Sequence, residues 1–284
     1  MNPIAIITDS DASLPPALAE QYGIQQVPIT IHFGDESYTT GIDIDDARLF
    51  EKIDRLNRLP TTAAPSPGAF ASAYERAFAA GAQGIVCVCV SSKVSATYNA
   101  ALTASEQFPG REIRVVDSLN LSMGQGFMVL AAAEAAQAGA SLDEIVAQAL
   151  DTGSRVHVYA VLATLKYLAL SGRVGKLAAG MADTLNIKPV LSVRDGKLDL
   201  LEKIRTRKKA VERMIELTRQ SLDGKRIERL GIIHVNHPAG AAELRDLLRA
   251  ALPCPEEIII AEFTAGLSVH AGAGVVGLAL VTGK

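Results

Sequence analysis

The sequence contains no tryptophan, and aromatic residues make up only 5% of its 284 positions. Hydrophobic residues nevertheless account for 49%, so alanine, valine, leucine and isoleucine must provide most of the packing. This composition is typical of α/β proteins, whose buried strands consist mainly of aliphatic residues.

Cysteine is also scarce. Cys87 and Cys89 alternate within the apolar segment GIVCVCV, and Cys254 stands alone near a proline. With 3 cysteines and no CxxC spacing, the sequence favours neither a disulfide framework nor a zinc site. We expect buried, reduced cysteines that act as small apolar residues.

Charge of one sign and long hydrophobic runs are lacking as well. The formal net charge is −3, which gives no basic field for binding nucleic acid or an anionic membrane. The longest apolar runs are interrupted by Glu134, or by His157 and Lys166, and neither resembles a span of about 20 apolar residues. No basic leader precedes the strand that begins at Ile4, so we expect a cytoplasmic protein.

Several catalytic motifs are missing. There is no GxGxxG after the first strand, no Walker A loop, no HExxH and no GxSxG. No pair of carboxylates stands out at a site, and His and Cys are too scattered to predict a metal centre. The polar groups that remain are mostly neutral hydroxyls and one histidine, which suits holding a small anionic head group better than breaking a bond.

Strand and helix patterns divide the chain into two parts. Strands and helices alternate in the first part, which predicts a mostly parallel, doubly wound α/β sheet over residues 1–153. In the second part, Asp195-Gly196 predicts a two-residue hairpin, so residues 154–284 should form an α+β domain with a mixed or antiparallel sheet. The predicted strands are 4–9, 24–33, 84–90, 112–117, 157–163, 187–204 (the hairpin), 229–235, 256–263 and 275–281. The predicted helices are 15–22, 45–56, 67–80, 95–108, 122–137, 142–152, 207–220 and 239–250.

Hydroxyl groups follow several strands, where ligands of open parallel sheets bind. Ser92 and Ser95 come after the strand GIVCVCV and before a helix whose N-terminus would favour an anion. Thr61 and Thr62 occupy a loop, in LPTTAAPSPGAF, where they have no evident structural purpose. Each serine could instead be a helix cap.

One histidine and two basic segments complete the candidates. His270 is flanked by glycines in GLSVHAGAG, and such glycines allow a ligand to approach the backbone. Arg173 in LSGRVGKL and Arg205 in KIRTRKKA belong to a local basic patch. That patch is either a solvated helix start or a docking surface for phosphate or an acidic partner.

The sequence resembles the DegV family of fatty-acid-binding proteins, which serve a bacterial fatty acid kinase. The resemblance extends over nearly the whole chain, and its segments follow the family's order. They are IITDSDASLP, VPITIHFGDESYTTGIDI, TTAAPSPGAF, VSSKVSATYNAA, VVDSLNLSMGQG, LSGRVGK, LNIKPVLSVRDGKL, KIRTRKKA and GLSVHAGAGVVGLAL.

The resemblance implies a two-domain protein that encloses a long-chain fatty acid in an apolar tunnel between or within its domains. Thr61, Thr62 and Ser92 would hold the carboxylate, with His270 nearby. A separate ATP-dependent kinase would phosphorylate the bound acid for phospholipid synthesis, with Arg173 and Arg205 facing the partner or the phosphate. The protein would be a carrier and not an enzyme, and would need no cofactor or metal. We expect a monomer that contacts membranes only transiently, for lipid exchange.

The sequence departs from the family pattern at the head-group loop. The family's Thr-Ser-Gln-Pro-Ser is Thr-Thr-Ala-Ala-Pro-Ser here, and Ala273 replaces the proline of the histidine motif. Ala96 replaces the glycine of Ser-Gly-Thr-Tyr. Two other functions stay open from the residues alone: a stand-alone hydrolase or phosphotransferase that uses His270 and Ser92, and a carrier of another apolar acid.

Overall fold

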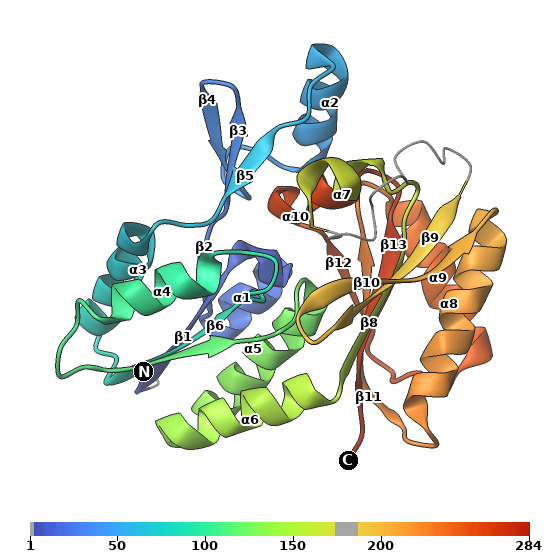
Figure 1. The fold of residues 1–284 in the computed structure, drawn as a ribbon. Coiled ribbons are helices and arrows are strands. Elements are labelled where there is room, and N and C mark those ends of the chain that lie inside the picture. The colour runs from blue at the N-terminus through green and yellow to red at the C-terminus, as the bar shows by residue number, and fades with distance from the viewer. Residues whose placement is uncertain (1–2, 174–186) are drawn as a thin grey trace.

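The first sheet is parallel and has four strands, as the N-terminal part of the sequence predicts (Figure 1). The computed structural model describes residues 3–173 and 187–284. The sheet has the strand order β2-β1-β6-β7, and its central strands are buried and aliphatic. Its strands are β1 (Ile4–Asp9), β2 (Gln25–Val27), β6 (Gly84–Cys89) and β7 (Glu112–Asp117).

The second sheet is mixed and has six strands in the order β10-β9-β8-β13-β11-β12. All neighbouring strands are antiparallel except β11 and β12, which are parallel. Its strands are β8 (Val156–Val161), β9 (Lys188–Arg194), β10 (Lys197–Ile204), β11 (Ile227–His234), β12 (Ile259–Glu262) and β13 (Val276–Thr282). The predicted fold class, α/β with one parallel and one mixed sheet, is therefore confirmed.

A third sheet, which the sequence did not predict, consists of β4 (Glu36–Thr39), β3 (Thr30–Phe33) and β5 (Thr61–Ala63) in that order. The single strand predicted over 24–33 is wrong, because the chain breaks around Pro28 and continues as two strands in different sheets. Proline has no N–H to donate to a strand pair, which explains the break. The predicted threonine loop is also wrong, since Thr61 and Thr62 belong to β5.

Helices cover both sheets and fill the space between them (Figure 1). α5 packs against strands of both sheets and is buried on nearly all sides, which explains its continuous apolar sequence. α3 and α4 cover the other face of the parallel sheet, and α8 and α9 cover the outer face of the mixed sheet. The longer helices are α2 (Asp46–Leu56), α3 (Pro67–Ala79), α4 (Thr97–Ser105), α5 (Met123–Gln137), α6 (Leu142–Ser154), α8 (Arg207–Leu222) and α9 (Pro238–Ala251).

Short helices lie near the third sheet and after the first strand. They are the 3₁₀-helix η1 (Ser10–Ala12), α1 (Pro16–Tyr22), α7 (Lys166–Ser171) and α10 (Ala265–Ala271). The sequence predicted no helix at α10, a segment with Gly266 inside it and Gly272 directly after it. Residues 174–186, which include the second half of the basic segment LSGRVGKL, lie outside the described residues.

The two larger sheets share one apolar core. Val86 of the parallel sheet and Leu191 of the mixed sheet belong to the same buried cluster. The predicted boundary between residues 153 and 154 falls at the end of α6, directly before β8. The division into two domains stays a prediction.

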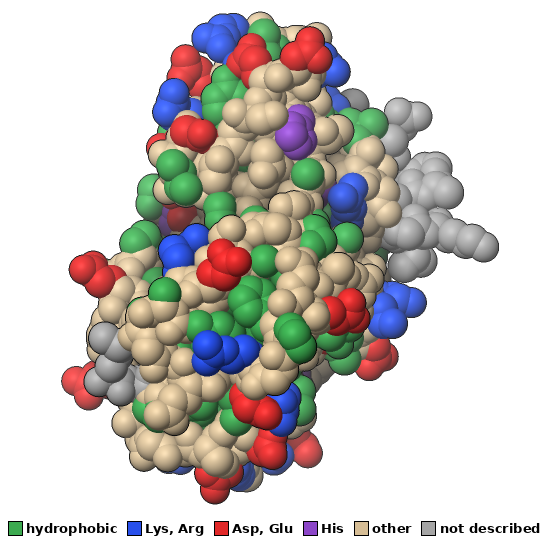
Figure 2. All heavy atoms as spheres, turned by 90° about the vertical axis from the view of Figure 1, so that its left-hand side faces the viewer, with side chains coloured by type: hydrophobic (Ala, Val, Ile, Leu, Met, Phe, Trp, Pro, Cys, Tyr) green, Lys and Arg blue, Asp and Glu red, His purple; other side chains and the backbone are tan. Residues whose placement is uncertain are grey.

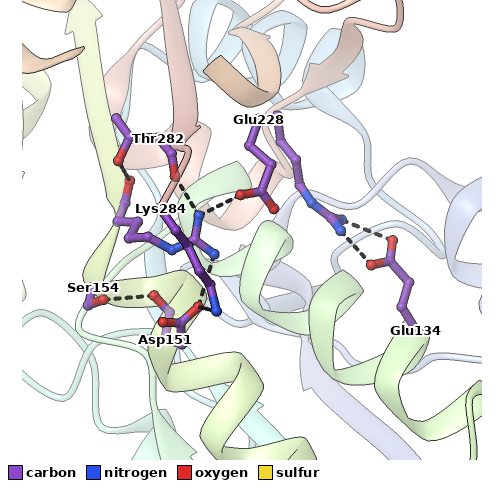
Figure 3. Close-up of polar contacts among 8 residues, drawn as sticks. Glu134, Asp151, Ser154, Glu228, Thr282 and Lys284 are labelled. Carbon is purple, nitrogen blue, oxygen red and sulfur yellow. Dashed lines mark hydrogen bonds and ion pairs between the residues drawn. The ribbon is translucent and has the colours of Figure 1, made fainter. Parts of the chain in front are cut away.

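Ion pairs reinforce the contact between α5, α6 and the mixed sheet (Figure 3). Arg229 of β11 donates two hydrogen bonds to Glu134 of α5, one of them at 3.0 Å. Arg155, just before β8, donates to Glu228 at 2.6 Å and to Asp151 of α6 at 3.0 Å. Paired guanidinium and carboxylate groups of this kind fix orientation as well as adding energy.

The surface carries both signs of charge. On the face drawn in Figure 2, acidic and basic side chains are interspersed among apolar patches. Among the helices that the structure describes, none is long and apolar enough to cross a membrane.

Candidate functional site

Strand β5 places its two threonines on opposite sides. Thr62 pairs with Ile31 and Thr61 with His32 of the central strand β3, and successive side chains of a strand point to opposite faces. Thr62 is half-buried and its Oγ1 lies 2.9 Å from Nε2 of His270, whereas Thr61 is exposed. The structure thus separates two residues that the sequence treated as a pair.

A cavity of about 510 Å³ lies beside Thr62. It is bordered by η1, which follows β1, by β5, by the segment between β6 and α4, and by α10. Five of the predicted site residues line it: Thr62, Ser92, Ser95, Arg173 and His270. Two others, Thr61 and the exposed Arg205, are not among the lining residues. Further lining residues are Asp11, Ile29, Ala64, Val90, Lys93, Val94, Ala96, Asn99, Leu121, Leu198, Gly266 and Leu267.

His270 is held neutral at physiological pH. Burial and, after it, the nearby positive charge of Arg173 together lower its pKa to about 4. Its Nε2 is hydrogen-bonded to Thr62, while its buried Nδ1 has no hydrogen-bond partner within residues 3–173 and 187–284. A neutral imidazole carries one N–H and one acceptor nitrogen, so the tautomer decides what Thr62 can offer.

The serines after β6 are held by short local contacts. The Ser92 N–H donates to Asp117 at the end of β7, at 3.1 Å. The Ser95 hydroxyl lies 2.8 Å from the hydroxyl of Thr97, the first residue of α4. Ser95 precedes Ala96, the N-cap residue of α4, which has no side-chain capping hydrogen bond, so the capping alternative is not confirmed. Ser95 also lines the cavity.

The hairpin between β9 and β10 closes one side of the cavity. Its turn residues Asp195 and Gly196 have positive φ values of 48° and 78°, as a tight two-residue turn requires. The Ser91 hydroxyl donates to the carbonyl of Gly196 at 2.7 Å. This bond ties the mixed sheet to the parallel sheet next to Leu198, which lines the cavity.

A second, apolar space, the apolar channel, adjoins the cavity. His270, Leu121, Leu198 and Leu267 line both spaces. The channel runs between the inner face of the mixed sheet and helices α7 and α10, and its volume is about 60 Å³. Its other lining residues are Val158, Ala160, Leu162, Leu168, Leu191, Ser192, Val193, Ile233, Phe263, Ala271 and Val275.

The sequence analysis missed several of these residues. Leu121, Leu198 and Leu267 come from three distant segments, and nothing in their local sequence distinguishes them from core leucines. Asp11 could have been noticed, because it follows Asp9 by two positions at the end of the first strand. The statement that no carboxylate pair stands out is therefore wrong for Asp9 and Asp11, which influence each other's pKa.

The site shows neither a metal cluster nor a catalytic triad. Among the described residues, no group of three or more His, Cys, Asp or Glu side chains could hold a metal ion. His270 contacts Thr62 and not Ser92, and no carboxylate of the described chain orients its Nδ1.

A hydroxyl-lined cavity beside an apolar one offers complementary surfaces for a ligand with a polar head and a hydrocarbon tail. The family model described as "Uncharacterised protein, DegV family" matches residues 3–283. The chain therefore belongs to the DegV family.

Relatives match over almost their full length. A DegV domain-containing protein of Mycobacterium tuberculosis is 38% identical over 283 residues, which cover 99% of this chain and 98% of the relative. One of Streptomyces coelicolor is 35% identical over 275 residues, 97% of each chain.

Solved structures show the same fold. A DegV family protein from Thermus thermophilus, described by its fatty acid binding, has a TM-score of 0.91 at 32% identity and covers 98% of this chain and 99% of its own. DegV from Bacillus subtilis, described as a fatty acid binding protein, has a TM-score of 0.89 at 29% identity, with complete coverage of both chains (100%).

Proposed function

We propose that this protein binds a long-chain fatty acid, with the acyl chain in the apolar channel and the carboxylate in the adjoining cavity. The observation that carries the proposal is that the two spaces adjoin each other, since His270 and three leucines line both. The descriptions of the Thermus and Bacillus proteins as fatty-acid-binding support it.

The acyl chain supplies most of the binding energy. About 15 methylene groups at ~0.8 kcal/mol each give roughly 12 kcal/mol before the costs of association. The channel as observed, about 60 Å³, has room for only about four water-sized spheres. Side chains of α7 and α10, such as Leu168 and Leu267, would therefore have to move away from the mixed sheet as the chain enters.

Neutral hydroxyls would satisfy the carboxylate. A buried carboxylate without hydrogen-bond donors is costly, and Thr62, Ser92 and Ser95 each offer one O–H group. Thr62 can give its O–H to the ligand only when Nε2 of His270 carries the proton and donates to Oγ1. We infer this tautomer for the loaded protein, with Nδ1 as the acceptor nitrogen.

The second part of the proposal is presentation to an ATP-dependent kinase, which would convert the bound acid into an acyl phosphate for phospholipid synthesis. Hydroxyl donors leave the carboxylate oxygens more accessible than a bidentate arginine would. Arg173 at the cavity and Arg205, exposed between β10 and α8, would contact the partner or the phosphate. The carrier itself would act without a cofactor, as a monomer in the cytoplasm that touches membranes only to exchange lipid.

Phosphorylation assays test the presentation step. Loaded protein is mixed with ATP and a bacterial fatty acid kinase, and acyl phosphate is trapped as a hydroxamate. Wild type should yield hydroxamate, and Thr62→Arg should bind the acid yet transfer poorly. Unimpaired transfer by Thr62→Arg would contradict the role of neutral donors.

The alternative of a stand-alone hydrolase or phosphotransferase has less support. Ser92 would be its nucleophile, but His270 contacts Thr62 instead. Turnover of a p-nitrophenyl ester or phosphate by the purified protein alone, lost in Ser92→Ala, would favour this alternative.

A further inference from the structure

Two buried carboxyl groups, Asp9 and Asp11, lie at the end of β1 in opposite environments. Asp9 is fully buried and Asp11 is 7% exposed. When two interacting acids have different surroundings, the pair divides into one ionised and one protonated member.

Asp9 is the ionised member, because donors surround it. Its Oδ1 accepts a hydrogen bond from the Asp11 N–H at 2.9 Å. Its Oδ2 accepts from the Val90 N–H at 2.8 Å and from the Gln125 amide at 3.1 Å. Burial raises its pKa, these donors counteract part of the rise, and the result is a pKa of about 6, so Asp9 is mostly charged at pH 7.

Asp11 has the opposite surroundings. Its buried Oδ1 has no hydrogen-bond partner among the described residues. This oxygen faces Gly266 of α10, and a Cβ added at Gly266 would lie 3.0 Å from it. Burial and, after it, the charge of Asp9 raise the pKa of Asp11 well above its usual value, while Thr264 opposes the rise. Asp11 therefore keeps its proton at pH values at which an exposed aspartate is already ionised.

Asp11 also lines the proposed head-group cavity, as Thr62 and His270 do. Gly266 and His270 are four positions apart on α10, and such residues are neighbours on one helix face, about one turn apart. A carboxylate placed between Thr62 and Asp11 could accept a hydrogen bond from each.

We propose that Asp11 is a specificity-determining residue that stays protonated and donates a hydrogen bond to the carboxylate of the bound fatty acid. This inference rests on the proposed function. Asp11 would thereby act as a neutral donor, like the threonine and serine hydroxyls, and would add no charge to compete for the ligand oxygens.

The other charged or titratable groups near Asp11 allow this role. The negative charge of Asp9 favours the neutral form of Asp11, and His270 is itself neutral. Lys93 and Arg173 also line the cavity, and both are exposed, so solvent weakens their effect. Above the pKa of Asp11 the donor becomes an anion, and affinity for the carboxylate should fall about tenfold for each pH unit.

Asp11→Asn and Asp11→Ala test the proposal with palmitate and with hexadecanol, whose head group does not ionise. Dissociation constants are measured between pH 6 and 9 by displacement of a fluorescent fatty acid. Asparagine keeps a neutral donor of the same shape, so its palmitate affinity at pH 6 should match wild type. Alanine should bind palmitate about 10- to 100-fold more weakly while its hexadecanol affinity changes less.

The ratio of the palmitate affinities of wild type and Asp11→Asn reports the ionisation of Asp11 alone, because the ionisation of palmitate affects both proteins equally and cancels. If Asp11→Asn binds palmitate more tightly than wild type at pH 6 to 7, Asp11 is charged there and the proposal is overturned. Equal palmitate binding by Asp11→Ala also overturns it. An infrared difference spectrum of wild type minus Asp11→Asn should show a protonated carboxyl band, and its absence at pH 7 contradicts the proposal.

The experiments distinguish a failure of the proposed fatty acid binding from a failure of the proposal about Asp11. If wild type binds neither palmitate nor hexadecanol, fatty acid binding is wrong, whereas the infrared band still reports on the proton of Asp11.

Discussion

The hydroxyl of Thr62 lies 2.9 Å from Nε2 of His270, although 208 positions separate the two residues in the chain. This contact joins β5 of the small third sheet to α10, directly where the cavity meets the apolar channel. It assembles the proposed head-group site from two segments that share no sheet. The geometry of the site thus depends on the position of α10 relative to β5.

Thr62→Val is nearly isosteric and removes the hydroxyl that is offered to both His270 and the ligand. Loss of a hydrogen bond to a charged group should weaken fatty acid binding by about 1.5–3 kcal/mol, or roughly 10- to 150-fold. Isothermal titration with palmitate measures the change. Thr61→Val is the matched control, because Thr61 is exposed and outside the cavity lining, and it should bind as wild type does. Equal losses in both variants would show that β5 matters only as structure.

Gly196→Ala should disturb the contact between the hairpin and the parallel sheet. A Cβ at Gly196 would lie 2.4 Å from Oγ of Ser91, and the positive φ of 78° adds backbone strain. We expect a loss of about 1–3 kcal/mol in unfolding free energy, together with weaker ligand binding, because Leu198 lies in the same hairpin. Denaturant titration and palmitate binding measure both effects.

Gly224→Ala separates the clash from the strain in the Gly196 experiment. Gly224 has the same φ of 78°, but no atom lies within 4 Å of the position that an added Cβ would take. It should lose stability through strain alone and leave ligand binding unchanged. Similar ligand binding by the two variants would rule out the hairpin as a wall of the site.

Glu134→Gln tests the ion pair that ties α5 to the mixed sheet. The change leaves the partly buried Arg229, whose side chain is 26% exposed, without its charged partner. We expect a loss of about 1 kcal/mol in unfolding free energy, with partial solvent screening already included. Glu112→Gln removes one of the two acidic partners of the more exposed Arg114, which keeps Asp143 at 3.5 Å, and should change stability little. If Glu112→Gln costs as much as Glu134→Gln, the interface has no special role.

Asp46→Asn should change how stability depends on pH. Burial raises the pKa of Asp46 from its usual 3.8 to about 7, although the Ser268 hydroxyl donates to its Oδ2 at 2.9 Å. The folded protein holds this proton more tightly than the unfolded chain does. The contribution of Asp46 to the free energy of unfolding is therefore fully present below about pH 4. It declines as the pH rises to about 7, by up to about 1.4 kcal/mol per pH unit.

The Asp46→Asn variant lacks this pH dependence. Between pH 4.5 and 7 its free energy of unfolding should therefore rise relative to that of wild type. Urea titrations at several pH values give that difference, in which the contributions of other acids cancel. A difference that is independent of pH would mean that Asp46 is ionised in the folded protein.

Much of the architecture followed from local sequence patterns. The buried run GIVCVCV indicated a central parallel strand, and Asp195-Gly196 indicated the hairpin. The third sheet could not be predicted in this way. β4 and β5 are short and polar, so they lack the apolar alternation that marks a strand, and their pairing with β3 is a tertiary feature. α10 is only seven residues long, and its Gly266 and β-branched Val269 have low helix propensity, so it gives little helical signal.

The site was predictable in its residue types and less so in its geometry. The hydroxyls and His270 drew attention because no stronger catalytic motif competes with them. Thr61 could be distinguished from Thr62 only once β5 was known, since strand alternation decides which side chain faces the cavity. Asp11 matters because of what surrounds it, and the sequence around a residue does not show which distant groups it will face.

Native mass spectrometry of the protein purified without delipidation tests the central claim most directly. The account predicts a bound species whose mass matches a long-chain fatty acid, one per chain, and which is displaced by added palmitate. A co-purified ligand of another class that palmitate does not displace would contradict the account, as would a protein that neither carries nor takes up a fatty acid.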